Sequence, residues 1–241
     1  MPFSVFSRLS DSRFIDSVWN SHSERGGQFM SVAVNQWGLV FTRIAGKLSI
    51  FVRGPETVAT TADCPPEGEW MGVQFKLGVY LPEMPILRLV DNEIALPVAR
   101  SNSFWLNGQT YEMPTFENAE TFVERLNRSG ALFEDRVVQS SLRGEAIAVT
   151  ERTKRRRFLD ATGMTFGQIT QIERAQHATK LLSSGVSILD AVAQAGYADQ
   201  PHLTRSLRRF IGQTPLQLLQ AHKAMPLSLV RPADAQSDFA G

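Results

Sequence analysis

The chain has 241 residues, of which 43% are hydrophobic and 20% charged, a composition typical of a folded protein with one or two domains. Its single cysteine excludes an internal disulfide and a zinc site built from several cysteines. Its apolar runs are too short to cross a membrane, and the N-terminus has no apolar signal core, so we expect a cytoplasmic protein without a membrane partner.

The net charge of +1 conceals two regions of opposite charge. Residues 1–131 hold 11 Lys and Arg against 14 Asp and Glu, a net charge of −3. Residues 132–226 hold 13 Lys and Arg against 8 Asp and Glu, a net charge of +5. This asymmetry favours a nucleic acid as the partner of the C-terminal region.

The N-terminal region has the pattern of short strands separated by turn residues. Runs rich in β-branched and aromatic residues predict strands at 29–34, 39–43 and 48–52. Residues 70–79 alternate between apolar and polar side chains, and Asn107-Gly108 between two apolar flanks predicts a hairpin. Many short strands joined by frequent turns predict a small β-barrel or sandwich.

All four tryptophans lie in this region, at Trp19, Trp37, Trp70 and Trp105. They either line a ligand pocket or, as we expect for most of them, pack in the core. We expect Cys64 to be an unreactive thiol in a surface loop.

The N-terminal region has no recognisable set of catalytic residues. His22 is the first histidine and His177 the second, so the clustered histidines of a metal-dependent enzyme are missing. Nucleophile-elbow, phosphate-loop and dinucleotide motifs are also missing from the sequence. We therefore expect neither a metal, nor a cofactor, nor enzymatic activity.

Helical spacing begins at residues 118–126, where Ser129-Gly130 ends the predicted helix. Thr165 is expected to cap a long helix over 166–183, and Ser187 a shorter one that precedes Gly196. We expect a β-rich domain at residues 1–131, a helical domain at 132–222 and a disordered tail at 223–241.

Part of the helical region is repeated with a spacing of 49 residues. Residues 150–158 recur in outline as residues 199–207. Both copies continue to a Gly, a Thr and a Gln at equivalent positions, namely Gly163 and Gly212, Thr165 and Thr214, Gln168 and Gln217. Each copy predicts a capped helix that is apolar on one side and carries arginines on the other, a shape that fits a DNA major groove.

The second copy has every feature of a groove-reading helix. Asp199 caps it, and Leu203, Leu207 and Phe210 form its apolar stripe at helical spacing. Its other face carries side chains able to contact bases or phosphates, namely Gln200, His202, Arg205, Ser206 and Arg209.

Residues 187–215 resemble the signature of the AraC/XylS family of bacterial transcription regulators. The most distinctive parts are Gly196-Tyr197-Ala198-Asp199-Gln200-Pro201-His202 and the closing Phe210-Ile211-Gly212-Gln213-Thr214-Pro215. The resemblance covers about residues 138–219. It implies an all-α domain with two helix-turn-helix units joined by a long helix, which follows an N-terminal cupin-like barrel.

The resemblance also implies the sites and partners. Carried over to this sequence, the DNA-contacting positions of the first unit are Arg152, Thr153, Arg155 and Arg156. Those of the second unit are Gln200, His202, Arg205, Ser206 and Arg209. Double-stranded promoter DNA is the implied partner, and RNA polymerase, a small-molecule effector and a second copy of the chain stay open as further partners.

The first copy departs from this pattern. Lys154 occupies the position that apolar Leu203 has in the second copy, and Ile147 or Ala148 stands where a turn glycine is expected. Lys154 can lay its stem along the core while its ammonium stays in water. Our hypothesis is that the first unit supplies affinity through phosphates, whereas the second supplies much of the sequence preference.

Two alternatives to an effector-sensing regulator stay open. The N-terminal domain could act without a ligand, for dimerisation or partner binding only. A cupin-type enzyme fused to a DNA-binding domain is the other alternative, which the lack of clustered metal ligands disfavours.

Overall fold

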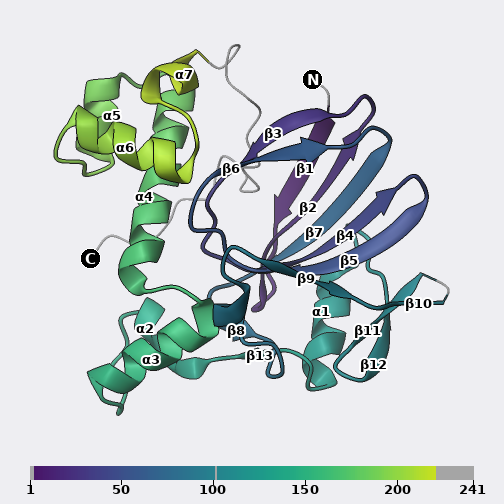
Figure 1. The fold of residues 1–241 in the computed structure, drawn as a ribbon. Helices are drawn as coiled ribbons and strands as arrows, with labels where there is room; N and C mark the ends of the chain where they lie inside the picture. The colour runs from purple at the N-terminus through teal and green to yellow at the C-terminus, as the bar shows by residue number, and fades with distance from the viewer. Residues whose placement is uncertain (1–2, 101, 221–241) are drawn as a thin grey trace.

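The computed structural model describes residues 3–100 and 102–220. In Figure 1 these residues form a β-rich part and, beside it, a helical part that runs along a long helix. The predicted order, a β-rich region followed by a helical one, is therefore confirmed.

The main sheet is antiparallel, with six strands in the order β1-β2-β7-β4-β5-β9. Its strands are β1 Phe3–Leu9, β2 Ile15–Ser23, β4 Gly38–Ile44, β5 Lys47–Arg53, β7 Gly68–Phe75 and β9 Glu93–Leu96. One face of the sheet packs on α1, which spans Ala119–Arg128, where the helical spacing over residues 118–126 predicted a helix. The core between them is aromatic, with Phe41, Phe104, Tyr111 and Phe122 in edge and tilted contacts.

The smaller sheets have two or three strands each. They are β3 Gly27–Ser31 with β6 Thr60–Cys64, β8 Val79–Tyr80 with β13 Phe133–Glu134, and β10 Val98–Ala99 with β11 Ser103–Leu106 and β12 Gln109–Glu112. Asn107 and Gly108, both with positive φ, make the predicted hairpin turn between β11 and β12. A short 3₁₀ helix, η1, spans Ile86–Leu89.

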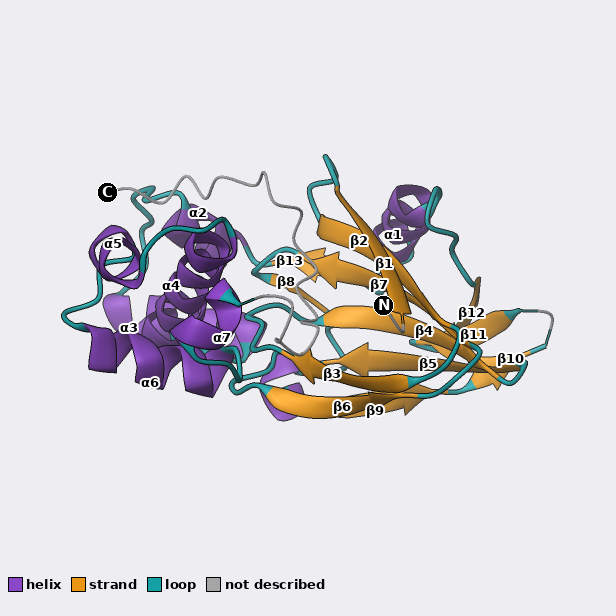
Figure 2. Cartoon of the chain, turned by 90° about the horizontal axis from the view of Figure 1, so that it is seen from above, coloured by secondary structure: helices purple, strands orange, loops and turns teal. Residues whose placement is uncertain are grey.

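The expected barrel does not close among the described residues, because the strands end in separate sheets rather than one continuous ring. Figure 2 shows the β3–β6 ribbon lying apart from strands β1 and β2 of the main sheet. The strand predicted at 29–34 ends at Ser31, since the following residues leave the sheet for the helical part.

The other N-terminal expectations have mixed outcomes. Trp37 is buried and stacks on Phe75 at 4.1 Å, as expected for a core residue. Trp105, by contrast, is 47% exposed. Cys64 is buried at the end of β6, so the expected surface loop was wrong.

Six helices follow the junction within the part of the chain that the structure describes. They are α2 Arg136–Leu142, α3 Glu151–Thr162, α4 Phe166–Ser183, α5 Ile188–Gln194, α6 Gln200–Phe210 and α7 Pro215–Leu219. The predicted N-caps at Thr150, Thr165, Ser187 and Asp199 are confirmed, because each side chain accepts a hydrogen bond from a backbone N–H of the first turn. None of the helices in the described ranges is both long and apolar enough to span a membrane. The tail expected at 223–241 lies outside the described residues.

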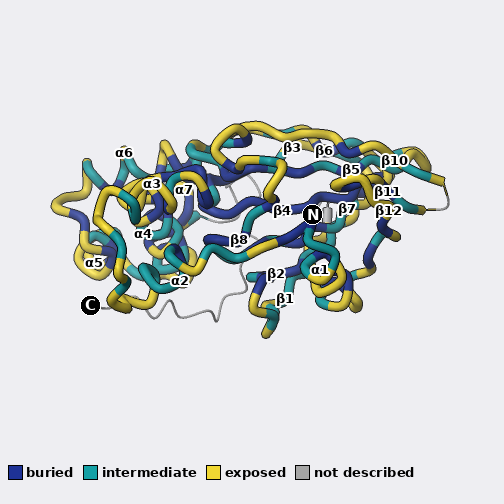
Figure 3. The backbone as a smooth tube through the Cα atoms, turned by 90° about the horizontal axis from the view of Figure 1, so that it is seen from below, coloured by how far each residue is buried: buried dark blue, intermediate teal, exposed yellow. Residues whose placement is uncertain are grey.

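The described residues form two hydrophobic cores. Figure 3 shows buried segments in both the β-rich and the helical part. The first core lies between the main sheet and α1, and the second among the helices. Val32 and Ala33 come from the β-rich part but are fully buried in the helical core. The helical part therefore completes its core with residues from the N-terminal one.

Candidate nucleic-acid interface

The second reading helix, α6, begins at a complete cap. The Asp199 carboxylate accepts a hydrogen bond from the His202 N–H at 2.7 Å, and Pro201 occupies the first turn, where its missing N–H costs nothing. Leu203, Leu207 and Phe210 are buried, as the apolar stripe predicted. Burial of this stripe leaves the opposite side of α6 at the surface.

That opposite side carries the predicted DNA-contacting residues. Gln200, Arg205 and Arg209 are exposed, whereas His202 and Ser206 are half-buried. The structure thus brings all five to the accessible part of one helix. Their contact with DNA stays a prediction.

A buried tyrosine supports α6 from the turn of the second unit. The hydroxyls of Tyr197 and Ser206 are 2.8 Å apart, and the Tyr197 ring meets the edge of His202 at 5.1 Å between centroids. The guanidinium of Arg174, on α4, lies 4.5 Å from the centre of the Tyr197 ring, and its Nη1 donates to the Gly196 carbonyl at 3.3 Å. These contacts join α4, the turn and α6.

The sequence pattern missed this cluster. From the sequence, Tyr197 is only part of the family signature, and no role is predicted for Arg174. The usable signal was the aromatic residue directly after the turn glycine, because a buried tyrosine hydroxyl needs a hydrogen-bond partner.

The first reading helix, α3, also has a complete cap. Thr150 accepts a hydrogen bond from the Thr153 N–H at 3.2 Å, and the two threonine hydroxyls are 2.9 Å apart. Arg152, Arg155 and Arg156 are exposed, whereas Thr153 is half-buried and its hydroxyl is engaged at the cap. Of the four predicted residues, the arginines are therefore the most available to a partner.

Ion pairs occupy two more charged residues of α3. Lys154 Nζ donates to Glu151 Oε1 at 2.7 Å, and this contact lowers the pKa of the Glu151 carboxyl. Arg157 Nη1 lies 3.3 Å from an oxygen of Asp135, the residue that caps α2. The ammonium group of Lys154 thus lies at the surface, as we predicted for a lysine whose aliphatic stem lies along the core.

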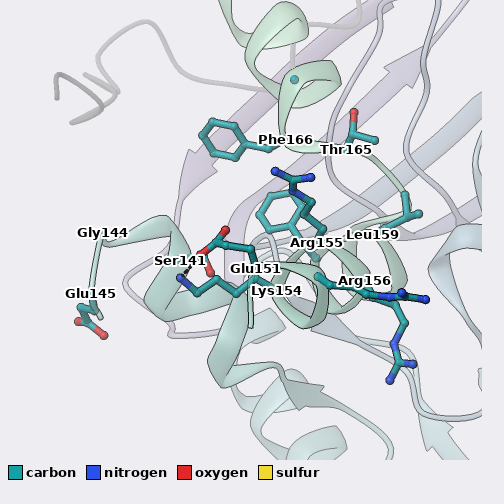
Figure 4. A pocket seen from close by; sticks show the side chains of 13 residues that line it. Ser141, Gly144, Glu145, Glu151, Lys154, Arg155, Arg156, Leu159, Thr165 and Phe166 are labelled. Atoms are coloured by element: carbon teal, nitrogen blue, oxygen red, sulfur yellow. Dashed lines mark hydrogen bonds and ion pairs between the residues drawn. The ribbon is translucent and has the colours of Figure 1, made fainter. Parts of the chain in front are cut away.

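An open cleft of about 880 Å³ lies beside α3, lined by Phe158, Leu159 and Phe166 and by charged residues that include Glu151, Lys154 and Arg155. Figure 4 shows Lys154 and Glu151 on one side of it and Arg155 extending toward Phe166 and Thr165 on the other. In the repeat, α5 ends at Gln194, the counterpart of Glu145, whereas α2 ends at Leu142. The first unit therefore has a longer loop between its two helices than the second.

The long helix α4 fixes how the two reading helices are spaced. Its 18 residues, at about 1.5 Å each, span roughly 27 Å. In Figure 1 α3 lies near one end of α4 and α6 near the other, and Figures 2 and 3 place both on the same side of it. The length of α4 approaches the roughly 34 Å of one DNA turn, which is compatible with one face of a duplex meeting both helices.

The β-rich part contacts the end of α6 through its backbone. The Ala33 N–H donates to the Phe210 carbonyl at 2.7 Å, and the Ala59 N–H donates to the Arg209 carbonyl at 2.8 Å. Carbonyls in the last turn of a helix have no partner inside it, so these bonds complete the C-terminus of α6. Gln176 on α4 adds a bond from Nε2 to the Ala33 carbonyl at 2.9 Å.

The first unit is also attached to the β-rich part. Gln139 Nε2 donates to the Leu77 carbonyl at 2.6 Å, and the Asp135 N–H donates to the Gly78 carbonyl at 2.8 Å. Gly163, after α3, lies against Val90 and Ile86 of the η1 segment. Together with the contacts of α6, these form the interdomain contact, which holds both ends of α4.

The described residues contain no group of three or more His, Cys, Asp or Glu side chains placed to hold a metal ion. The accessible chemistry of this surface is instead cationic and hydrogen-bonding. Guanidinium groups with amide, imidazole and hydroxyl groups on two spaced helices match the phosphates and base edges of DNA.

Two capped helices on one side of a connecting helix define a double helix-turn-helix protein of the DNA-binding class. Residues 144–221 match the family profile described as "Helix-turn-helix domain". The chain carries an AraC-type helix-turn-helix domain over these residues, which confirms the resemblance seen in the sequence.

Known structures show a more distant similarity. A 1.65 Å structure of ToxT from Vibrio cholerae has a TM-score of 0.41 at 8% identity, covering 91% of this chain and 98% of that chain. An apo variant of ToxT from strain SCE256 has a TM-score of 0.37 at 9% identity, covering 91% and 97%. No curated protein matches the sequence.

Proposed function

We propose that this chain is a sequence-specific DNA-binding transcription regulator of promoter DNA in the bacterial cytoplasm. The observation that carries the proposal is the pair of capped, arginine-bearing helices on one side of α4, whose 18 residues span roughly 27 Å. The AraC-type domain supports it, and the role requires binding rather than catalysis.

Within this proposal the contacts divide between the two units. The exposed residues Arg152, Arg155 and Arg156 of α3 contact the duplex mainly at phosphates, with Thr153 at the edge of the same surface. The residues of α6 that read base edges are Gln200, His202, Arg205 and Ser206, and Arg209 contacts phosphate. The proposed extents are residues 1–131 for the N-terminal domain and 132–222 for the DNA-binding domain.

Fluorescence anisotropy with labelled duplexes tests DNA binding itself. We expect binding to mixed-sequence duplex that weakens steeply with salt, because several arginines displace condensed counterions. Affinity that does not depend on salt, or no binding at low salt, would exclude the proposed function.

We propose that the N-terminal domain senses a small molecule, with RNA polymerase and a second copy of the chain as further partners of the regulator. Thermal-shift screening against small metabolites tests the sensing role. A ligand present at 100 times its dissociation constant should stabilise the protein by about 2.7 kcal/mol.

A second candidate role for the N-terminal domain follows from the interdomain contact. Val32 and Ala33 complete the helical core, and Ala33 and Ala59 donate to the end of α6. These contacts favour a domain that supports the reading helix without any ligand. DNA affinity that is unchanged by every metabolite tested would favour this role over sensing.

A further inference from the structure

Tyr197 connects the turn of the second unit to the surface that faces DNA. It is 6% exposed, and the atom within hydrogen-bond distance of its hydroxyl is Ser206 Oγ at 2.8 Å. Ser206 is half-buried on the same helix as exposed Arg205. The hydroxyl pair therefore spans from the interior of the domain to its reading face.

The direction of this hydrogen bond follows from the acidity of the two hydroxyls. A phenol, with a pKa near 10, is a stronger donor than an aliphatic alcohol, and an alcohol oxygen is the better acceptor. The geometry allows either direction, and the acidity of the phenol favours Tyr197 as the donor to Ser206. With Tyr197 as the donor, the oxygen of Ser206 is occupied on its inner side and its proton is left to point outward.

Three contacts hold the phenol in place. The Tyr197 N–H donates to the Val192 carbonyl at 2.9 Å, and the Arg174 guanidinium covers one face of the ring at 4.5 Å from its centre. His202 meets the ring at 89° between planes, so a second candidate reading residue rests on the same support. Rotation of the ring away from Ser206 would break its contacts with Arg174 and His202.

We propose that Tyr197 is a positioning residue that holds Ser206 as a hydrogen-bond donor toward an acceptor atom on a base edge of the major groove. The acceptors of this class are purine N7, guanine O6 and thymine O4. The proposal rests on the proposed function, since it concerns how the second unit selects its sequence.

The first unit lacks an equivalent arrangement among the described residues. In the repeat, Ala148 is the counterpart of Tyr197 and Arg157 that of Ser206. Arg157 is paired with Asp135 instead. A buried hydroxyl that bonds to a side chain of the reading helix is thus a feature of the second unit. This agrees with the proposed role of that unit in sequence preference.

The test compares DNA binding by Tyr197→Phe, Ser206→Ala and the double variant of the full chain, with a duplex selected by the unmodified protein and with a mixed-sequence duplex. Each single variant should bind the selected duplex about three- to tenfold more weakly, as expected for one lost hydrogen bond. The double variant should lose little more, because both changes remove the same function. Affinity for the mixed-sequence duplex and its salt dependence should not change, because no phosphate contact is lost.

Tyr111→Phe is the matched control. Its hydroxyl is also paired with a serine, Ser129, at 2.7 Å, but it lies in the β-rich part. This variant should change thermal stability without changing the preference for the selected duplex. An equal loss of preference in Tyr111→Phe would show that the effect of Tyr197→Phe is merely structural and would overturn the inference.

Base analogues identify the acceptor. One acceptor at a time is removed from the selected duplex, with 7-deazapurines for N7, 2-aminopurine for guanine O6 and a pyrimidinone for thymine O4. One analogue should weaken binding of the unmodified protein about three- to tenfold and leave that of Ser206→Ala unchanged. The inference is overturned if every analogue affects both proteins alike.

The outcomes separate this inference from the proposed function. Failure of the unmodified protein to prefer any duplex would contradict the proposed function, and the inference would fall with it. If the unmodified protein clearly prefers the selected duplex and Tyr197→Phe shows the same preference, the inference is overturned while the proposed function stands.

Discussion

At the scale of single residues, the two copies of the repeat differ most at Lys154 and Leu203. Leu203 is fully buried, whereas Lys154 pairs with Glu151 at the surface beside the open cleft. A lysine at this position cannot fill the core without burying its charge, which is costly. The asymmetry seen in the sequence is therefore present in the packing, and it was predictable because it depends on one local substitution.

The matched arginines Arg156 and Arg205 test whether the two units have different roles. Replacing Arg156 by Ala should weaken binding to all duplexes about equally and lower the slope of log affinity against log salt by about 1. Replacing Arg205 by Ala should cost about 1–3 kcal/mol on the selected duplex and much less on mixed sequence. Anisotropy titrations at several salt concentrations measure both effects.

The opposite pattern would contradict this division. If Arg156→Ala relaxed the preference at one base position and kept its affinity for mixed-sequence DNA, the first unit would be reading bases. The sequence hypothesis about the first unit would then be wrong.

Glu120 is predicted to make the stability of the N-terminal domain depend on pH. Arg8 binds it through Nη1 at 2.6 Å and Nη2 at 2.8 Å, and Ser10 adds a hydrogen bond at 2.7 Å. The bonds from Arg8 lower the pKa of Glu120 from 4.5 to about 2. A lowered carboxyl pKa stabilises the fold above pH 4.5, and this contribution is lost as the pH falls toward 2.

Thermal unfolding as a function of pH checks this expectation. Glu120→Gln should unfold at a lower temperature at pH 7, and its stability should fall less between pH 4.5 and 2 than that of the unmodified chain. Glu145→Gln, at a more distant pair with Arg143 (3.7 Å), should leave the curve nearly unchanged. Parallel curves for Glu120→Gln and the unmodified chain would contradict the assigned role.

At the scale of elements, the helices were more predictable than the strands. The caps at Thr150, Thr165, Ser187 and Asp199 are local signals, and the structure confirms them. Strand β2 was missed because its buried residues include Ser17 and Ser23, which give no apolar alternation. A local pattern cannot predict a strand whose burial depends on distant partners.

The strand that begins near residue 29 illustrates the same limit. Val32 and Ala33 continue its apolar run, but the run leaves the sheet because Ala33 bonds to Phe210. The Tyr197–Ser206 pair was likewise missed, since hydroxyl pairing between a turn and a helix depends on how they pack. The sequence therefore predicted the element on which these residues lie, but it did not predict the residues that they contact.

Gly163 tests how closely the first unit packs on the η1 segment. Its φ is +74°, and an added Cβ would lie 2.8 Å from Val90 Cγ2 and 3.3 Å from the Ile86 carbonyl oxygen. Gly185 has a φ of +89° but open space around it. Gly185→Ala should cost about 1–2 kcal/mol through backbone strain alone, and Gly163→Ala should cost about 1–3 kcal/mol more through overpacking.

Urea denaturation of the two variants gives the comparison. Equal losses of stability would show that Val90 and Ile86 can move away at no cost. The contact between α3 and η1 would then be too loose to fix the position of the first unit.

At the scale of the whole molecule, the β-rich part and the DNA-binding part are joined at both ends of α4. The β-rich part supplies Val32 and Ala33 to the helical core and two N–H donors to the end of α6. The two domains were predicted from their net charges and from the spacing of their apolar residues. Neither property reveals contacts between the two parts. We infer that any rearrangement of the segment at residues 32–35 would reach the second reading helix directly.

Native-state hydrogen exchange tests this connection. The Ala33 and Ala59 amides should exchange with the same free energy of opening as the amides at the end of α6, because they open together. Fast exchange at Ala33 and Ala59, with α6 still protected, would show that the two parts separate without disturbing the reading helix.

Selection of bound duplexes from a random pool by the full chain tests the central claim most directly. The account predicts enriched sequences with two groups of preferred bases about one helical turn apart on one face, because α3 and α6 lie on one side of α4. The group read by the second unit should be the more strictly defined. A pool that stays random, or that keeps one short group of bases, would contradict a protein that reads DNA with two unequal helix-turn-helix units.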